Sequence, residues 1–372
     1  MPGALQEEIY QVKTSQITSA AAGLTVLLPV FNGAQYIAEA LESILRQTYT
    51  NFELLVINDG STDDTLAILE GFAARDGRVR VVSRENRGLI ATLNQGLALS
   101  NTDLIVRMDA DDVALPNRLE RQAIFMAEHP EVAVSGTAMV FYETGEERNL
   151  PEGHDELKAL SLFNTPVFHP TVIMRKSRVL AVGGYSSNAP CAEDYDLWER
   201  MLHAGSKFAN LGEALLRYRL HPSVNRAKYY VMMTATSLDI CGRQLERLGL
   251  PADAASLALH RICCAPCPET SGMRTKLIDW LHRIEKANIA NPLYQKEALE
   301  CELAARERAL SLLSPLRQPI RWSIRHLRHL AHALLALARR TMPDLAPVWE
   351  GCLASCWWHV KRKVLMRSWV RK

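Results

Sequence analysis

The sequence predicts an α/β fold in which a mainly parallel, twisted sheet is flanked by helices, followed by an all-α C-terminal region. Two observations support this. Short apolar runs rich in Val, Ile and Leu alternate four times with helical patterns within about 90 residues, which is typical of a parallel sheet wound through right-handed crossovers. After about Arg226 the strand patterns stop, and the chain becomes rich in Leu, Ala and Arg and is interrupted by prolines.

The first four predicted strands have the length and composition of buried strands. They span residues 24–29, 52–57, 79–82 and 104–108. Apolar residues at helical spacing lie between them, each set marking one helix face. These sets are Ile37, Leu41, Ile44 and Leu45, then Leu66, Leu69 and Phe72, then Leu89, Leu93 and Leu97. Farther along, we expect strands at 132–141, 170–174 and 215–220, and an amphipathic helix at 194–204.

The composition is that of a globular protein. Of 372 residues, 48% are hydrophobic and 23% are charged, which argues against wholesale disorder, collagen and a polytopic membrane protein. The sequence shows neither a signal peptide nor an uncharged apolar run of the ~18 residues that a spanning helix needs, so we expect a cytoplasmic location. The eight cysteines are unevenly spaced, and Cys263, Cys264 and Cys267 lack a second ligand cluster at zinc-finger spacing; we interpret them as small apolar residues.

Charge is unevenly distributed along the chain. The formal net charge is +2, yet residues 315–372 contain 12 Lys or Arg and 2 Asp or Glu. Together with Trp357, Trp358 and Trp369, this favours helices that lie on the cytoplasmic face of the inner membrane, with basic side chains toward anionic headgroups. A helical subdomain packed on the catalytic domain or on a second subunit explains the pattern equally well. No nucleic-acid partner is expected, because no matching signature accompanies the charge.

We therefore divide the chain into four predicted segments. They are an N-terminal tail at 1–22, a catalytic domain at 23–225, a helical region at 226–314 and a basic amphipathic tail at 315–372.

Acidic residues follow two of the predicted strands. In a parallel α/β sheet, ligands bind beyond the carboxyl ends of the strands, so these positions are candidates for a site. Asp59 follows the second strand, and Asp109, Asp111 and Asp112 follow the fourth. Three carboxylates so close together repel one another unless they share a cation, and oxygen ligands suit Mg²⁺ or Mn²⁺. A turn-forming role for Asp59, and a solvated or helix-capping role for the acidic triplet, remain alternatives.

The ordered set of motifs resembles the family 2 glycosyltransferases with the GT-A nucleotide-sugar-binding fold. The likeness covers residues 24–225 approximately. The motifs are Val26-Leu-Leu-Pro-Val-Phe-Asn-Gly33, Gln47-Thr-Tyr-Thr-Asn-Phe-Glu-Leu54, Asn58-Asp-Gly-Ser61, Asn86-Arg-Gly88 with Asn94-Gln-Gly96, the DxD element Asp109-Ala-Asp111, and Ala192-Glu-Asp-Tyr-Asp-Leu-Trp198.

The resemblance implies a role for each matching position. Asp59 would hold the nucleobase, Asp109 would contact the ribose or the metal, and Asp111 would bind Mn²⁺ or Mg²⁺ bridging the diphosphate. His221 at the end of the last predicted strand would complete the metal shell. The remaining residues expected to bind the nucleotide sugar are Pro29, Phe31, Asn32, Asn86, Gly88, Ala110, His169 and Arg217.

Sugar transfer also needs a base for the acceptor hydroxyl. The resemblance places it at Asp194, with Glu193 orienting the acceptor or donor sugar, and implies inversion by single displacement. Acids at the start of a helix also favour its dipole regardless of function, so a purely structural role is the alternative for this pair.

The resulting hypothesis is an inverting, metal-dependent hexosyl- or N-acetylhexosaminyltransferase. It would use a nucleotide-diphosphate sugar, with UDP expected, and a glycan or lipid-linked acceptor in cell-surface polysaccharide synthesis. One alternative is a sugar-1-phosphate nucleotidyltransferase, which predicts a Gly-rich basic loop where this chain has Pro29-Val-Phe-Asn-Gly33. The other is a non-catalytic nucleotide-sugar-binding module.

Overall fold

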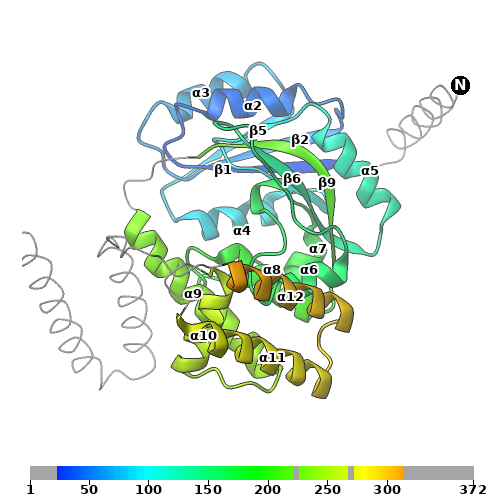
Figure 1. Cartoon of the computed structure of the whole chain (residues 1–372). Coiled ribbons are helices and arrows are strands. Elements are labelled where there is room, and N and C mark those ends of the chain that lie inside the picture. Colours follow the sequence, from blue (N-terminus) through cyan, green and yellow to red (C-terminus); the bar gives the residue numbers. More distant parts are fainter. Residues whose placement is uncertain (1–22, 221–225, 267–271, 313–372) are drawn as a thin grey trace, which may run out of the picture. The chain divides into compact units, whose positions relative to one another are not determined.

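The computed structural model describes residues 23–220, 226–266 and 272–312 (Figure 1). It divides into two compact units, Met1–Pro222 with Asn288–Ala305, and Ser223–Ala287 with Arg306–Lys372. The two predicted tails and His221 lie outside the described residues. The domain boundaries drawn from the sequence therefore stay a prediction.

The first unit is built on one nine-stranded mixed sheet with the order β3-β2-β1-β4-β8-β6-β9-β5, and β7 pairs with β6. The strands are β1 (Leu24–Val30), β2 (Phe52–Asn58), β3 (Val79–Ser83), β4 (Leu104–Arg107), β5 (Val113–Ala114), β6 (Val132–Phe141), β7 (Glu147–Arg148), β8 (Ile173–Arg175) and β9 (Lys207–Tyr218). Strands β1 to β4 match the first four predicted strands, and they pair in parallel, so their carboxyl ends meet at one edge.

Alternating side chains of the parallel strands point to opposite faces of the sheet and build two separate cores. In β1, Val26 and Leu28 belong to the first core and Leu27 to the second. Helices α2 (Ile37–Leu45) and α3 (Thr65–Ala73) pack in the first core, and α4 (Leu89–Leu99) and α8 (Glu193–His203) in the second (Figure 1). Both faces of the sheet are thus covered, which explains why its strands are continuous apolar runs.

The second half of the sheet contains two short strands that were not predicted, β5 and β7, and two predicted strands, β8 and β9, whose bounds differ from the prediction. Strand β8 pairs antiparallel with β4 and begins at Ile173, because His169–Thr171 form a 3₁₀ turn with Pro170 in its first turn. Strand β9 begins at Lys207, eight residues before the predicted start at 215. Register shifts interrupt its pairing with β6, and Gly212 and Glu213 break the apolar pattern there, so its first half did not read as a strand.

Three further helices within residues 23–220 lie between these strands along the chain. They are α5 (Arg118–Glu128), α6 (His154–Leu160) and α7 (Lys176–Ala181). Helix α8 begins one residue before its predicted start.

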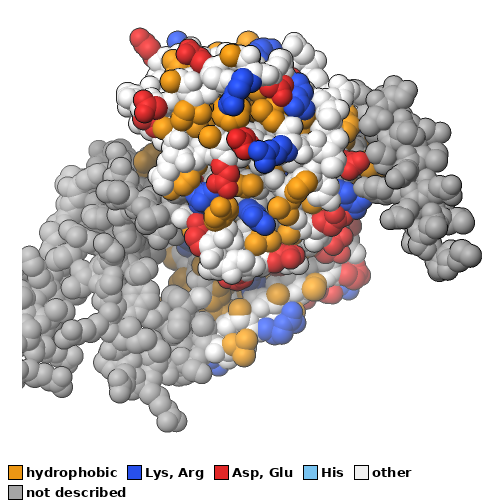
Figure 2. Space-filling model, turned by 90° about the horizontal axis from the view of Figure 1, so that it is seen from above, with side chains coloured by type: hydrophobic (Ala, Val, Ile, Leu, Met, Phe, Trp, Pro, Cys, Tyr) orange, Lys and Arg blue, Asp and Glu red, His pale blue; other side chains and the backbone are white. Residues whose placement is uncertain are grey.

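From residue 226 onward the described residues form helices, as predicted. These are α9 (Arg226–Arg247), α10 (Ala254–Cys264), α11 (Arg274–Ala290) and α12 (Lys296–Leu312). Among the described residues, no helix has both the length and the apolar composition needed to cross a membrane. On the face drawn in Figure 2, acidic and basic side chains of the described residues are interspersed with apolar ones. The basic excess of the sequence belongs to residues 315–372, outside that description.

Candidate functional site

The loops that follow β1 and β2 are tied together by side chain to backbone hydrogen bonds. The backbone N–H of Asn32 donates to Ser61 Oγ at 2.9 Å, and the backbone N–H of Thr62 donates to the side-chain Oδ1 of Asn32 at 2.8 Å. Asn32 has φ 52°, a left-handed conformation that Asn tolerates better than most residues. Pro29 is buried in β1, whereas Phe31 is 52% exposed beside this junction. The two loops therefore form one rigid element with an exposed aromatic ring.

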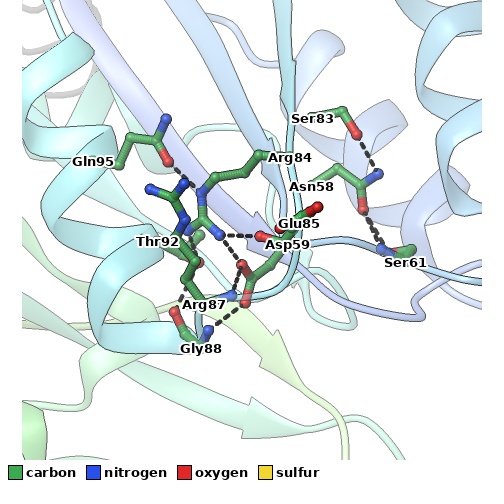
Figure 3. Close-up of polar contacts among 10 residues, drawn as sticks. All are labelled: Asn58, Asp59, Ser61, Ser83, Arg84, Glu85, Arg87, Gly88, Thr92 and Gln95. Atoms are coloured by element: carbon green, nitrogen blue, oxygen red, sulfur yellow. Dashed lines mark hydrogen bonds and ion pairs between the residues drawn. The ribbon is translucent and has the colours of Figure 1, made fainter.

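Asp59, at the end of β2, is a buried acceptor for the next loop (Figure 3). Its carboxylate accepts the backbone amides of Arg87 and Gly88, both at 2.9 Å, and forms an ion pair with Arg84. Gly60 has φ 75°, and a Cβ there would lie 2.5 Å from the Asn86 amide nitrogen, so only glycine allows the loops to approach this closely. Asp59 thus fixes the loop that carries Asn86 and Gly88, whose positions are exposed.

Arg84 is itself held from several sides. Its guanidinium also donates to Gln95 Oε1 at 2.5 Å, Thr92 Oγ1 at 2.9 Å and the Glu85 carbonyl at 2.7 Å (Figure 3). Because Gln95 and Thr92 belong to α4, Arg84 connects Asp59 to that helix. The position of the Asp59 carboxylate is therefore set by both the loop and the helix.

At the end of β4, Arg107 and Asp109 form a two-pronged ion pair. Arg107 Nη1 lies 2.6 Å from Asp109 Oδ2, and Nη2 lies 2.5 Å from Oδ1. The arginine is buried, while the aspartate side chain keeps 31% of its surface exposed. Burial opposes the charge of Arg107, but the Asp109 carboxylate outweighs this and raises its pKa. The pair orients Asp109 and leaves one side of it open.

Asp109, Asp111 and Asp112 bring carboxylate oxygens within 4.8 Å of one another. Asp112 is fully buried; its Oδ1 accepts the Arg219 amide at 3.0 Å, whereas its buried Oδ2 has no hydrogen-bond partner. Burial, followed by the Asp109 and Asp111 charges, raises the pKa of Asp112 to about 8. A clustered, partly unsatisfied set of hard oxygens fits a divalent cation such as Mn²⁺ or Mg²⁺.

A second buried arginine stabilises the end of β4. Arg118 on α5 is fully buried and donates through Nη2 to the carbonyls of Arg107 at 2.8 Å and Pro170 at 2.9 Å. Burial lowers the pKa of Arg118 to about 9. It ties β4 to the 3₁₀ turn that contains His169.

Arg219 forms the opposite side of the acidic cluster. Its Nε donates to the Asp111 carbonyl at 3.0 Å, and its Nη2 pairs with Glu39 at 2.7 Å. Its guanidinium also lies over the rings of Tyr142 and Tyr36, at 3.9 Å and 4.7 Å from their centroids. These contacts hold the DxD loop against the end of β9 and against α2.

The Glu-Asp pair at the start of α8 stands beside a buried aromatic group. His169 Nε2 and the Tyr185 hydroxyl are hydrogen-bonded at 2.8 Å, and the His169 ring lies edge-on to Trp198 at 5.9 Å. Burial, then the charge of Arg107, keeps the pKa of His169 well below its ordinary value. The imidazole is therefore neutral and shapes the site by packing and hydrogen bonding.

Glu193 and Asp194 share this environment. Burial and then the charge of Asp194 raise the pKa of Glu193 to about 7, and burial raises that of Asp194. Asp194 Oδ1 accepts the Tyr195 amide at 2.7 Å. The charges of Arg107 and Asp109 act on the pKa of both carboxylates, which indicates that the start of α8 lies near the end of β4.

Comparisons with known proteins agree with this geometry. The family model for glycosyl transferase family 2 matches residues 25–183. The putative glycosyltransferase EpsE of Bacillus subtilis is 37% identical over 203 residues, 53% of this chain and 72% of that protein. The O-antigen biosynthesis glycosyltransferase WbnJ of Escherichia coli is 33% identical over 204 residues, 53% of this chain and 80% of that protein. The chain belongs to glycosyltransferase family 2.

A solved structure supports the fold of this family 2 member. The mannosyltransferase PcManGT from Pyrobaculum calidifontis aligns with a TM-score of 0.54 at 18% identity, covering 88% of this chain and 94% of that chain. At this identity the likeness concerns the fold alone, and it confirms the predicted GT-A architecture followed by a helical region.

Most residues that the sequence analysis assigned to the glycosyltransferase site lie on the loops that follow β1, β2, β3 and β4, or at the start of α8. Ala110 packs against the first core beside Gly33, and Arg217 is exposed on β9 opposite Val113 of β5. His221 lies outside the described residues. The individual roles of all these residues stay predictions.

Several side chains of the site received no role from the sequence, among them Arg84, Arg107, Arg118 and Tyr185, and Asp112 was not separated from its acidic neighbours. Arg107 had a visible signal, since a charged residue at the end of a buried apolar strand needs an anionic partner. Asp112 was noticed as acidic but is distinguished from Asp111 only by its burial. Tyr185 has no sequence signal, because its contact with His169 depends on the tertiary fold.

Proposed function

We propose that this family 2 member is an inverting, metal-dependent glycosyltransferase that moves a hexosyl or N-acetylhexosaminyl group from a UDP-sugar to a glycan or lipid-linked acceptor. The observation that carries the proposal is the electrostatic coupling of Glu193 and Asp194 with Arg107 and Asp109. It indicates that an acid–base pair and a cluster of potential cation ligands serve the same small volume.

The two acids of α8 suit different tasks. Asp194 is half-buried and its Oδ1 accepts the Tyr195 backbone amide, and it is the candidate base for the acceptor hydroxyl. Glu193 is more deeply buried, and with a pKa near 7 it is partly protonated at neutral pH and can donate a hydrogen bond to a sugar oxygen. Direct attack by the activated hydroxyl would invert the anomeric carbon.

At the other side of the site, Asp111 and Asp112, with Asp109, would hold Mn²⁺ or Mg²⁺. Such an ion supplies positive charge for the departing diphosphate. Arg107 keeps Asp109 oriented, and Arg219 keeps the backbone of the acidic loop in place. Asp59 and the loop of Asn86 and Gly88 would form the nucleobase end, with Pro29, Phe31 and Asn32 beside it.

The relatives support a role in polysaccharide synthesis. Among them are WbnJ, named for O-antigen biosynthesis, and AmsE of Erwinia amylovora, named for amylovoran biosynthesis. Because PcManGT shares the fold and its complex contains GDP-mannose and Mn²⁺, GDP-sugars belong in the donor panel as well. A location at the cytoplasmic face of the inner membrane rests on residues 315–372, and loss of liposome association on deleting them would support it.

Sugar transfer with and without Mn²⁺ tests the proposal. Asp194→Asn and Asp111→Ala should each reduce turnover by at least about 100-fold, because they remove the base and a cation ligand. The control is Asp64→Asn, whose side chain is exposed at the start of α3. Unchanged turnover in the two variants would overturn the assigned roles, retention of anomeric configuration would overturn the single displacement, and UDP binding without turnover would indicate a binding module.

A further inference from the structure

The helical unit contains a second cluster of potential metal ligands, unrelated to the sugar site. It consists of Cys241 on α9 and of His260 and Cys264 on α10. His260 and Cys264 are four residues apart, so they lie on one face of α10. One ligand atom from each of the three residues lies within 4.8 Å of the others. Ligands around a tetrahedral zinc ion are about 3.6 Å apart, so only small movements separate this arrangement from coordination.

The three side chains are sheltered and contact one another. Cys241 is 2% exposed and His260 is fully buried, while Cys264 is half-buried. Side-chain hydrogen bonds link Cys264 to both Cys241 and His260. Two thiols and an imidazole converge in the interior of the helical unit, and the polar atoms of the imidazole cost free energy to bury unless they are bound by a partner.

The orientation of His260 is set by α11. Trp280 Nε1 donates to His260 Nδ1 at 3.3 Å, and the two rings meet edge-on at 6.4 Å. Nδ1 is thus engaged by the indole, so a metal ion would bind His260 through Nε2. The contact with Trp280 is long for an N–H···N hydrogen bond and can be exchanged at small cost.

We propose that Cys241, His260 and Cys264 bind a Zn²⁺ ion that joins α9 to α10. Two thiolates and one imidazole form a soft ligand set that favours zinc over Mg²⁺ or Mn²⁺. On binding, the two thiol protons leave to solvent, and the His260 proton moves from Nε2 to Nδ1. Water completes the coordination. Cys267 lies outside the described residues and is not counted among the ligands.

Neighbouring residues provide internal controls. Cys263 is adjacent to Cys264 but its Sγ points toward the Leu277 carbonyl, 3.9 Å away. Arg306 Nη1 donates to the Cys264 carbonyl at 2.8 Å, which secures the end of α10 independently of the thiols. Cys301 on α12 is exposed. Substitution of Cys263 or Cys301 should therefore leave metal binding intact.

The experiment measures zinc in the untagged full chain, purified under reducing conditions from zinc-supplemented cells. We expect about one zinc ion per chain in the wild type, and a bound zinc content that is at least about tenfold lower in Cys241→Ser, His260→Ala and Cys264→Ser. Cys263→Ala, Cys301→Ser and Asp111→Ala should retain the bound zinc. The Asp111→Ala variant shows whether zinc is bound at the proposed site or at the acidic cluster. If the ligand variants fail to fold, the wild-type chain still serves, because Co²⁺ added to zinc-depleted protein should give the visible absorption of tetrahedral thiolate-bound cobalt.

Three results would overturn the proposal. They are absence of zinc together with no cobalt spectrum, zinc content that the three ligand substitutions leave unchanged, and a Cys241–Cys264 disulfide in place of bound metal. Removal of zinc should also lower the melting temperature and change the tryptophan fluorescence, since the Trp280 contact with His260 must reorganise. None of these readouts depends on sugar transfer, so the zinc site and the proposed enzyme can fail separately.

Discussion

Glu193→Gln should make the folded chain more stable at pH 8 while reducing its activity. Glu193 is 8% exposed, and burial followed by the charge of Asp194 raises its pKa from 4.5 to about 7. The folded chain therefore binds this proton more tightly than the unfolded chain does. Stability falls as the pH rises from about 4.5 to about 7, because in that window folding takes up a proton, and it stays lower above pH 7.

The size of this effect follows from the shift in pKa. A difference of about 2.5 units at about 1.4 kcal/mol per unit is about 3 kcal/mol at pH 8, and close to zero at pH 4. Glutamine has a similar shape and no charge, so Glu193→Gln removes the penalty. Loss of function accompanied by a gain of stability is common for groups that act in catalysis.

Urea unfolding of the full chain at pH 5, 6, 7 and 8, in buffer without divalent ions, measures the effect. The stability difference between Glu193→Gln and wild type should grow with pH and level off above pH 7. Glu70→Gln, at an exposed position of α3, is the control and should show no such trend. A difference that is constant across the four pH values would refute the link between burial of Glu193 and its pKa.

Four further predictions concern the groups that support the site. Arg84→Gln should weaken UDP binding about tenfold in calorimetry, because Asp59 loses its ion pair, whereas Arg80→Gln, four residues earlier on the chain, should not; equal losses would contradict this. Arg107→Gln should lower the free energy of unfolding in urea by about 1–3 kcal/mol, which is less than the loss for a fully buried ion pair because Asp109 is partly exposed. Arg46→Gln, at an exposed position, should change this free energy by close to zero. The affinity of the wild-type chain for Mn²⁺ should rise from pH 6 to pH 8, because binding must displace the proton that Asp112 holds with a pKa of about 8. Asp112→Asn should make the affinity nearly independent of pH over this range. If the affinity of the variant rises with pH as steeply as that of the wild type, the assignment is refuted. Mn²⁺ at 100 times its dissociation constant should stabilise the wild-type chain by about 2.7 kcal/mol without any donor, and Asp111→Asn should abolish the shift.

The sequence predicted the parallel half of the sheet well because its strands are buried on both faces. Residues 24–30 of β1 contribute to both cores, so the strand reads as one apolar run with no helical period. Strand β9 was only half predicted, since Gly212 and Glu213 interrupt its pattern and its pairing with β6 is irregular. Pairing partners compensate for such interruptions, and a single sequence does not display them.

For the site, spacing and residue type located the acids but not their partners. The sequence placed Asp59 and Asp111 at strand ends, and the structure places both there. It did not reveal that Asp59 is occupied by Arg84 and by two loop amides, because that arrangement depends on Gly60 allowing the loops to approach. Nor did it distinguish Asp111 from Asp112, whose difference in burial arises from packing against β9.

Burial, together with the charge balance of the site, explains why Asp112, Glu193 and Asp194 have raised pKa values. Five carboxylates, from Asp109, Asp111, Asp112, Glu193 and Asp194, are near one another, and the buried cations beside them are Arg107 and Arg118. Arg107 is committed to Asp109, and burial has already lowered the pKa of Arg118. The excess of negative charge is relieved by protonation of Asp112 and Glu193, or by a cation. A bound divalent ion would therefore deprotonate Asp112 and, by lowering the pKa of the remaining acids, keep a larger fraction of them ionised at neutral pH. Cation binding and acid–base chemistry are in this way two consequences of the same buried charge.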